Sequence, residues 1–266
     1  IIGVERAENS LLGTIIDLIS IIGVLGGIST SLGLVGEQML SGLTYQYGMQ
    51  FSNFEIILVI AGFTLLINLT TVSGLERGIQ WISKANIYGF VIMMVALFIL
   101  GPTMFQLNLA TSAFGNYLNN FISMSTFTNA PNNVSWVGSW TIFYWGWWLA
   151  FAPMMGIYMA RLSKGRTIRE MAFTGVIATT SGVIPWYALF GGTAINFQFT
   201  GQADILGAVS EYGVEVAGFA LFNGMPFSLL LGALFFFLVI TFFVTTADAA
   251  SYGVSMIVES GRESPS

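Results

Sequence analysis

Aromatic side chains are concentrated in one apolar stretch between positions 140 and 151. They are Trp140, Phe143, Tyr144, Trp145, Trp147, Trp148 and Phe151. In a helix, one stripe about three turns long would contain Trp140, Tyr144, Trp147 or Trp148, and Phe151. An aromatic face attracts a cation by roughly 0.5–2 kcal/mol per ring, and a quaternary ammonium cannot be held by hydrogen bonds. The stripe therefore suits a cage for such a cation, with ordinary core packing as the alternative.

A second group of polar residues, Thr245-Thr246-Ala247-Asp248, interrupts the last apolar stretch. Hydroxyl oxygens can replace the water around a small hard cation such as sodium, especially beside carbonyls of a broken helix. An ionisable residue inside a membrane helix is a functional hypothesis by default. The alternative for Asp248 is a position near the cytoplasmic rim of its helix.

These side chains belong to a sequence whose composition excludes a soluble fold. Of its 266 residues, 55% are hydrophobic and 8% are charged, against about 25% charged in an average soluble domain. Apolar runs with few charges cover 11–36, 54–71, 87–107, 136–160, 171–196 and 226–257. Each is near or above the roughly 17–25 residues that cross a bilayer as a helix. We therefore expect an all-α polytopic membrane protein, with six transmembrane helices in one domain that covers 1–266.

The sequence contains neither cysteine nor histidine. This excludes disulfides, thiolate catalysis, haem ligation and most zinc chemistry. A membrane-embedded metalloenzyme is therefore not expected. The chain is expected to have no enzyme activity, no catalytic residue and no bound cofactor, and nucleic acid is not an expected partner. The chain starts at Ile1 and no signal sequence precedes the first apolar run, so it is expected to be an internal piece of a longer protein.

Basic residues mark one side of the predicted membrane. The eight are Arg6, Arg77, Lys84, Arg161, Lys164, Arg166, Arg169 and Arg262. The alternate connecting segments, 37–53, 108–135 and 197–225, contain no Lys or Arg. By the positive-inside rule the basic side is cytoplasmic, so both chain ends are expected there, in a multi-pass protein of the cell membrane. The cluster between 161 and 169 reflects topology and helix capping or, alternatively, senses anionic lipid or ionic strength.

Two outer segments and two helix interruptions complete the predicted organisation. Segment 108–124 has apolar residues at helical spacing and is expected either as an interfacial helix or as an ordered loop. Segment 202–213 predicts a second outer helix before a break at Asn223-Gly224-Met225-Pro226. In the first span, the glycines from Gly23 to Gly36 favour close helix contact or, alternatively, local unwinding. Pro153 removes a backbone hydrogen bond inside the fourth span, which suits a solute path or a purely structural helix.

The chain resembles the betaine/choline/carnitine transporter family in two neighbouring stretches, Trp140-Thr-Ile-Phe-Tyr-Trp-Gly-Trp-Trp148 and Ala160-Arg-Leu-Ser-Lys-Gly-Arg-Thr-Ile-Arg-Glu170. Further matches, such as Phe190-Gly-Gly-Thr-Ala-Ile195 and Phe243-Val-Thr-Thr-Ala-Asp248, extend the resemblance over essentially the whole chain. The resemblance implies a twelve-helix inverted-repeat (LeuT-like) fold, in which these six spans are helices five to ten. It also implies that the remaining helices lie outside this chain, and that the subunits form a homotrimer.

The same resemblance assigns roles to individual aromatic residues. Trp148, with neighbouring Trp147, matches the helix-eight part of the substrate cage. Trp140, Phe143 and Phe151 match positions that line the access path. Which of the two adjacent tryptophans faces the substrate stays open.

Ion-binding positions follow from the resemblance too. One family sodium site is matched by Phe242, Thr245 and Thr246. At the other sodium site, two threonines of the sodium-coupled members are replaced by Val24 and Ile28, and the phenylalanine that often follows the proline is replaced by Met154. The second site is therefore expected to be lost, so that one coupling sodium or none is expected.

The resemblance therefore predicts secondary active transport of a small quaternary-ammonium or sulfonium osmolyte, of the glycine betaine, choline or carnitine type. Sodium-coupled import is the first expectation, and sodium-independent substrate exchange is the alternative among transporters. A channel, or a membrane osmosensor without transport, is the alternative from another class. The expected partners are this solute, the coupling sodium and the lipid bilayer.

Overall fold

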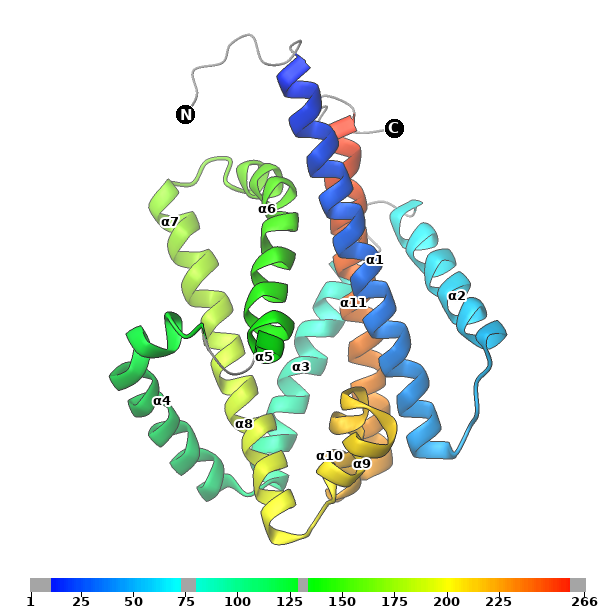
Figure 1. Ribbon diagram of the computed structural model, residues 1–266, viewed down its shortest axis with the longest axis vertical. Coiled ribbons are helices and arrows are strands. Elements are labelled where there is room, and N and C mark those ends of the chain that lie inside the picture. Colours follow the sequence, from blue (N-terminus) through cyan, green and yellow to red (C-terminus); the bar gives the residue numbers. More distant parts are fainter. Residues whose placement is uncertain (1–10, 73–79, 129–133, 259–266) are drawn as a thin grey trace. The chain divides into compact units, whose positions relative to one another are not determined.

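Helices make up the regular secondary structure of the described part of the chain, as Figure 1 shows. The computed structural model describes residues 11–72, 80–128 and 134–258. The α-helices are α1 (Leu11–Tyr47), α2 (Asn53–Val72), α3 (Gln80–Leu100), α4 (Thr103–Ser125), α5 (Val134–Val137), α6 (Phe143–Leu162), α7 (Ile168–Phe173), α8 (Thr179–Thr200), α9 (Ile205–Tyr212), α10 (Ala217–Asn223) and α11 (Ser228–Val258). The all-α prediction is thus confirmed. Arg6, Arg77 and Arg262 lie outside the described residues.

The chain divides into two compact units. The first contains Ile1–Leu32, Phe127–Met171 and Thr246–Ser266. It therefore includes α5, α6, the first part of α1 and the last part of α11. The second contains Gly33–Thr126 and Ala172–Thr245, and so includes α2, α3, α4, α8, α9 and α10. The aromatic stretch lies in the first unit.

Four helical stretches among the described residues are long and apolar enough to cross a membrane. They are Gly13–Tyr47, Trp81–Leu100, Ile168–Thr200 and Ser228–Val258. A shorter apolar helix covers Phe54–Leu69, and the expected span 136–160 falls on α5, α6 and the segment that joins them. These lengths support a multi-pass membrane protein, whereas the count of six crossings stays a prediction.

The expected third span, 87–107, is wrong at its second boundary. α3 ends at Leu100, and α4 begins at Thr103. Pro102 has no N–H with which to bond the Phe98 carbonyl one turn back, and the Thr103 hydroxyl donates to that carbonyl instead, at 2.5 Å. The chain therefore leaves α3 and starts a new helix, which confirms the helix predicted for 108–124 and excludes the ordered loop.

A buried glutamine connects this break to α8. Gln106 is fully buried, and its Nε2 donates to the Leu97 carbonyl (2.9 Å) and to Thr193 Oγ1 (2.7 Å). The Thr193 hydroxyl in turn donates to the Leu189 carbonyl at 2.6 Å. A Cβ atom at position 101 would lie 2.6 Å from Gln106 Nε2, so Gly101 leaves the space that the amide occupies.

Replacing Gln106 by leucine is expected to lower the free energy of unfolding by about 1–2 kcal/mol. The change removes two buried hydrogen bonds, which contribute about 1 kcal/mol each in proteins and somewhat less between membrane helices. Thermal unfolding of the full-length protein in detergent would measure the loss. Asn108→Leu, at an exposed position of the same helix, is the matched control, and equal stability of the two variants would contradict this role of Gln106.

The core of the second unit forms around α10 and α11. Phe219 and Phe222 of α10 each pack against Phe235 of α11, with ring centroids 5.2 and 5.4 Å apart. α9 begins at Asp204, whose carboxylate accepts the Gly207 N–H at 3.0 Å and so caps the helix. The helix predicted within 202–213 is therefore confirmed, and its position on the outer side of the membrane stays a prediction. The predicted break is confirmed as well, because α10 ends and α11 begins on either side of it.

Candidate functional site

The aromatic stretch lies on the segment Gly138–Ile142 and on α6, which follows it directly; Figure 1 shows the ribbon of α6. Several of its rings contact one another. Trp140 stacks on Tyr144, with ring centroids 5.9 Å apart and planes inclined by 4°. Phe143 and Tyr144 both contact Trp147, at 5.5 and 5.8 Å between centroids. These four residues, here called the aromatic ladder, cover about two helical turns. Three of the predicted site residues, Trp140, Phe143 and Trp147, therefore lie together.

The two adjacent tryptophans have different surroundings. Trp147 is half-buried within the aromatic ladder, and its indole Nε1 is buried without a hydrogen-bond partner among the described residues. Trp148 is 71% exposed. Trp147 is thus the tryptophan whose ring is fixed by other aromatic residues, and its N–H remains available as a donor. The role that the resemblance gives to Trp148 stays a prediction.

Phe151 does not join the aromatic ladder. It packs, half-buried, onto a small apolar core formed by Val24 of α1, Met154 of α6 and Ala250 of α11, which are 0%, 4% and 0% exposed. Ile28 packs against the same core. Hard cations such as sodium need oxygen ligands, and these side chains present methyl and thioether groups. Val24, Ile28 and Met154 therefore lie together, and the loss of one sodium site stays a prediction.

The first part of α1 packs closely on α6 through two of its glycines. Gly23 and Gly27 lie against residues of α6, whereas a Cβ atom at Gly26, Gly33 or Gly36 would meet nothing within 4 Å. α1 is continuous through all five positions. The close-contact prediction is therefore confirmed at two glycines, and the alternative of local unwinding is wrong.

The sodium-site candidates lie within one turn of α11. The Thr245 hydroxyl donates to the Phe242 carbonyl at 2.9 Å, and Thr246 follows directly. Thr245 is half-buried, whereas Thr246 and the Phe242 side chain are exposed. Because Thr245 donates its proton along the helix, its oxygen lone pairs remain for a donor or a cation. Hydroxyl oxygens are neutral ligands of the kind that sodium accepts, and the role of Thr245 and Thr246 in binding it stays a prediction.

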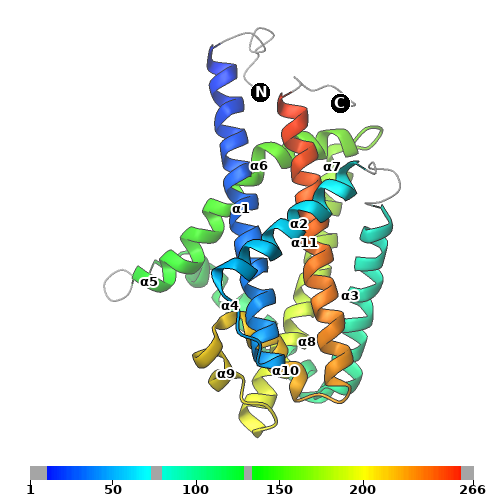
Figure 2. The same cartoon turned by 90° about the vertical axis from the view of Figure 1, so that its right-hand side faces the viewer.

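Asn86 of α3 is a candidate that the sequence argument missed. α3 runs beside α11 in both views (Figures 1 and 2), with a Cβ atom at Gly89 only 2.9 Å from Leu238. Asn86 is 3% exposed, and its Nδ2 approaches Thr245 Oγ1 at 3.5 Å. Its Oδ1 is buried without a hydrogen-bond partner among the described residues. The predicted span began at residue 87, so Asn86 lay just outside it, whereas the structure places Asn86 inside α3, where a buried amide needs a polar partner.

Asp248 lies in the protein interior. Its side chain is 1% exposed, so the carboxylate is not at a solvent-exposed rim of α11. A carboxylate in that position needs partners that stabilise its charge or its proton. The two interpretations of Asp248, an intramembrane functional residue and a position near the cytoplasmic rim, both stay predictions.

Two π-helical segments were not predicted. One, Gly138–Ile142, joins α5 to α6 and contains Trp140; the other, Thr174–Ala178, joins α7 to α8. π-turns inside α-helices are rare and occur frequently at functional sites. The first one lies at the start of the aromatic ladder, whereas α6 continues past Pro153 to its end without another change of helix type.

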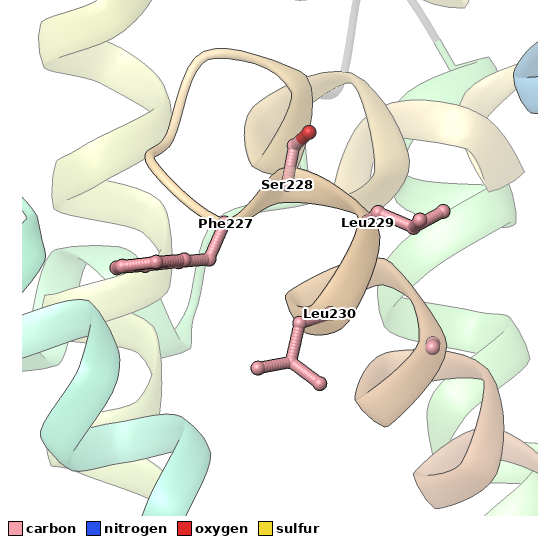
Figure 3. A pocket seen from close by; sticks show the side chains of 5 residues that line it. Phe227, Ser228, Leu229 and Leu230 are labelled. Carbon is pink, nitrogen blue, oxygen red and sulfur yellow. The ribbon is translucent and has the colours of Figure 1, made fainter.

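An open pocket beside the first turn of α11 contains none of the predicted site residues. It is lined by Phe227, Ser228, Leu229, Leu230 and Ala233. In Figure 3 the side chains of Phe227, Leu229 and Leu230 point in different directions. A solute site usually combines an enclosed apolar lining with converging polar groups, and this lining offers one serine hydroxyl. The aromatic ladder is therefore the better candidate.

Comparisons with known proteins identify the family of the chain as a whole. The model of the family described as "BCCT, betaine/carnitine/choline family transporter" matches residues 1–266. The chain is 40% identical to a probable glycine betaine transporter of Desulfitobacterium hafniense, over 96% of this chain and 51% of that protein. It is 35% identical to an ectoine/hydroxyectoine transporter of Virgibacillus pantothenticus (97% and 51%) and 32% identical to the glycine betaine transporter OpuD of Bacillus subtilis (97% and 50%). The chain thus spans about half the length of these relatives.

Proposed function

The chain belongs to the betaine/carnitine/choline transporter family, and from this premise we propose that it forms the central part of a secondary transporter for small quaternary-ammonium osmolytes. It is a membrane transporter and not an enzyme. The single observation that carries the solute class is the aromatic ladder. The LeuT-like inverted repeat, the homotrimer and the cytoplasmic position of both chain ends belong to the same proposal.

Recognition of the solute rests on the chemistry of the aromatic rings. A trimethylammonium or dimethylsulfonium group has no N–H to donate, so it is bound through ring faces and their quadrupoles. Phe143 and Tyr144 contact the Trp147 ring and each other, which reduces the entropy that the ring loses on binding. The buried Trp147 Nε1 can donate to the carboxylate of a betaine-type zwitterion. The aromatic ladder can thereby bind both the cationic group and the carboxylate of the solute.

Sodium is the proposed coupling ion. The Thr245 and Thr246 hydroxyls supply neutral oxygens, and Asn86 lies beside Thr245. Binding of sodium there would stabilise the conformation in which the surrounding oxygens are close enough to share the ion. Coupling follows if the solute binds that conformation more tightly, because linkage makes the two affinities reciprocal.

Exchange without sodium is the second candidate, and a specific observation favours it. The side chains of Val24, Met154 and Ala250 form a buried apolar core and carry no oxygen atoms, which supports the proposed loss of the other family sodium site. If one of the two family sodium sites is lost, transport that needs neither sodium ion is the next step. The osmolyte specificity of the aromatic ladder is the same under either mechanism.

Uptake by the full-length protein in proteoliposomes tests the function. Labelled glycine betaine should accumulate when sodium is present outside the vesicles and absent inside. Accumulation that requires only unlabelled betaine inside, with no sodium on either side, would establish exchange instead. Single-channel currents would establish a channel, and the absence of both uptake and current would reject transport and leave an osmosensor.

A further inference from the structure

The ring of Phe151 occupies the space that a side chain at position 27 of α1 would need. A Cβ atom built on Gly27 would lie 2.5 Å from Phe151 Cε2 and 2.7 Å from Cζ. Real Cβ atoms do not approach other carbons so closely. Gly27 is itself buried. The ring edge therefore lies directly on the backbone of α1, and only glycine permits this.

The position of the ring depends on this single glycine. The neighbouring Gly26 is exposed, and a Cβ atom there would meet nothing within 4 Å. Gly23, one turn earlier, faces the Ala150 backbone rather than a ring, with a Cβ atom 3.3 Å from the carbonyl oxygen. Among the glycines of the first part of α1, it is Gly27 whose replacement requires the Phe151 ring to move.

We propose that Gly27 is a specificity-determining position of the transporter, because it lets the Phe151 ring lie back against α1. This inference rests on the proposed function and on the access-path position that the family resemblance gives to Phe151. A methyl group at position 27 would overlap with the Phe151 ring. The ring would then move away from α1 and reduce the space that is left for the solute next to Phe151. The largest solute that fits beside Phe151 is then set by a residue that never contacts the solute.

The expected result is a change in solute size preference. In the full-length protein, Gly27→Ala should raise the KM for glycine betaine about ten-fold or more, the lower end of what one methylene changes in an apolar site, with a smaller effect on kcat. Dimethylglycine, which lacks one methyl group, should lose less affinity, measured by competition against labelled glycine betaine. Gly26→Ala is the matched control and should leave both values at wild-type level.

A second substitution shows whether Gly27→Ala acts through the Phe151 ring or through a change in the α1 backbone. Phe151→Leu in the Gly27→Ala background removes the conflict, so the preference for dimethylglycine should disappear. Failure of this rescue, or equal behaviour of Gly27→Ala and Gly26→Ala, would overturn the inference. If Gly27→Ala does not reach the membrane, the double variant must restore its level there, and absence of that recovery would overturn the inference equally.

The proposed function can fail separately. If wild-type protein takes up no osmolyte, solute transport is rejected, and the contact is then tested by thermal unfolding in detergent. Gly27→Ala should lower the unfolding temperature, Gly26→Ala should not, and Phe151→Leu should restore it in the double variant. An unchanged unfolding temperature in Gly27→Ala would show that the ring does not lie against α1.

Discussion

Trp147→Ala is expected to weaken osmolyte binding about ten-fold or more, whereas Trp145→Ala leaves it near the wild-type value. Trp147 contacts two rings of the aromatic ladder, while Trp145 is 68% exposed. Loss of one ring from a cation site costs roughly 0.5–2 kcal/mol, and loss of the buried indole donor adds to this in a zwitterion. Binding of glycine betaine to the full-length protein, followed by tryptophan fluorescence or calorimetry, gives the measurement.

Two further variants separate binding from stability. Trp147→Phe keeps an aromatic face and removes the N–H, so it should retain most of the affinity for choline, which has no carboxylate, and lose more for glycine betaine. Truncation to alanine can also destabilise the helix packing, so the unfolding temperature of each variant is measured alongside. If Trp148→Ala weakens binding strongly while Trp147→Ala does not, the assignment of the two tryptophans is reversed.

Thr245→Val is expected to raise the sodium concentration that half-saturates uptake about ten-fold or more. Valine keeps the shape of threonine and removes its oxygen. An interaction between a neutral oxygen and a charge contributes about 1.5–3 kcal/mol, and each 1.4 kcal/mol is a factor of ten in affinity. Thr246→Ala should act in the same direction. Uptake of labelled glycine betaine at a series of sodium concentrations in proteoliposomes measures the change.

A matched control lies one turn earlier on the same helix. The Thr241 hydroxyl donates to the Phe237 carbonyl at 2.7 Å, in the same way as Thr245 bonds along α11. Thr241→Val should therefore leave the sodium dependence unchanged, although it removes the same kind of bond. Uptake that is independent of sodium in the wild type, with Thr245→Val without effect, would contradict coupling and favour exchange.

Local sequence rules were sufficient for much of the helical organisation. The residue pattern of 202–213 predicted α9 and the Asn-Gly-Met-Pro break predicted where α11 begins, because both signals act within a few residues of where they occur. The aromatic stripe of 140–151 was visible from helical spacing, and three of its five predicted site residues do lie together. The resemblance placed Val24, Ile28 and Met154 at one site, and they share one apolar core in the structure.

Features that depend on distant contacts could not be predicted in the same way. Nothing local to Gly27 or Gly26 indicates that one contacts a ring and the other does not. The pairing of Asn86 with Thr245 joins residues 159 positions apart. The end of α3 was misplaced because a long apolar run was given more weight than the Gly101-Pro102 pair. The first two features depend on a residue of another helix. The boundary of α3 depends on two local signals that conflict.

The π-helical segment at Gly138–Ile142 changes which side of the helix the residues before it face, relative to the residues after it. An α-helix advances about 100° per residue, so a turn that holds one extra residue shifts the angular phase of everything before it by about that amount. Deleting one residue there would convert the turn to an ordinary α-turn and rotate Trp136 about the axis relative to Trp147, while Tyr144 and Trp147 would keep their mutual alignment. Insertion or deletion of a single residue at this position would therefore rotate the aromatic side chains before the segment, while the contacts between Tyr144 and Trp147 after it stay the same.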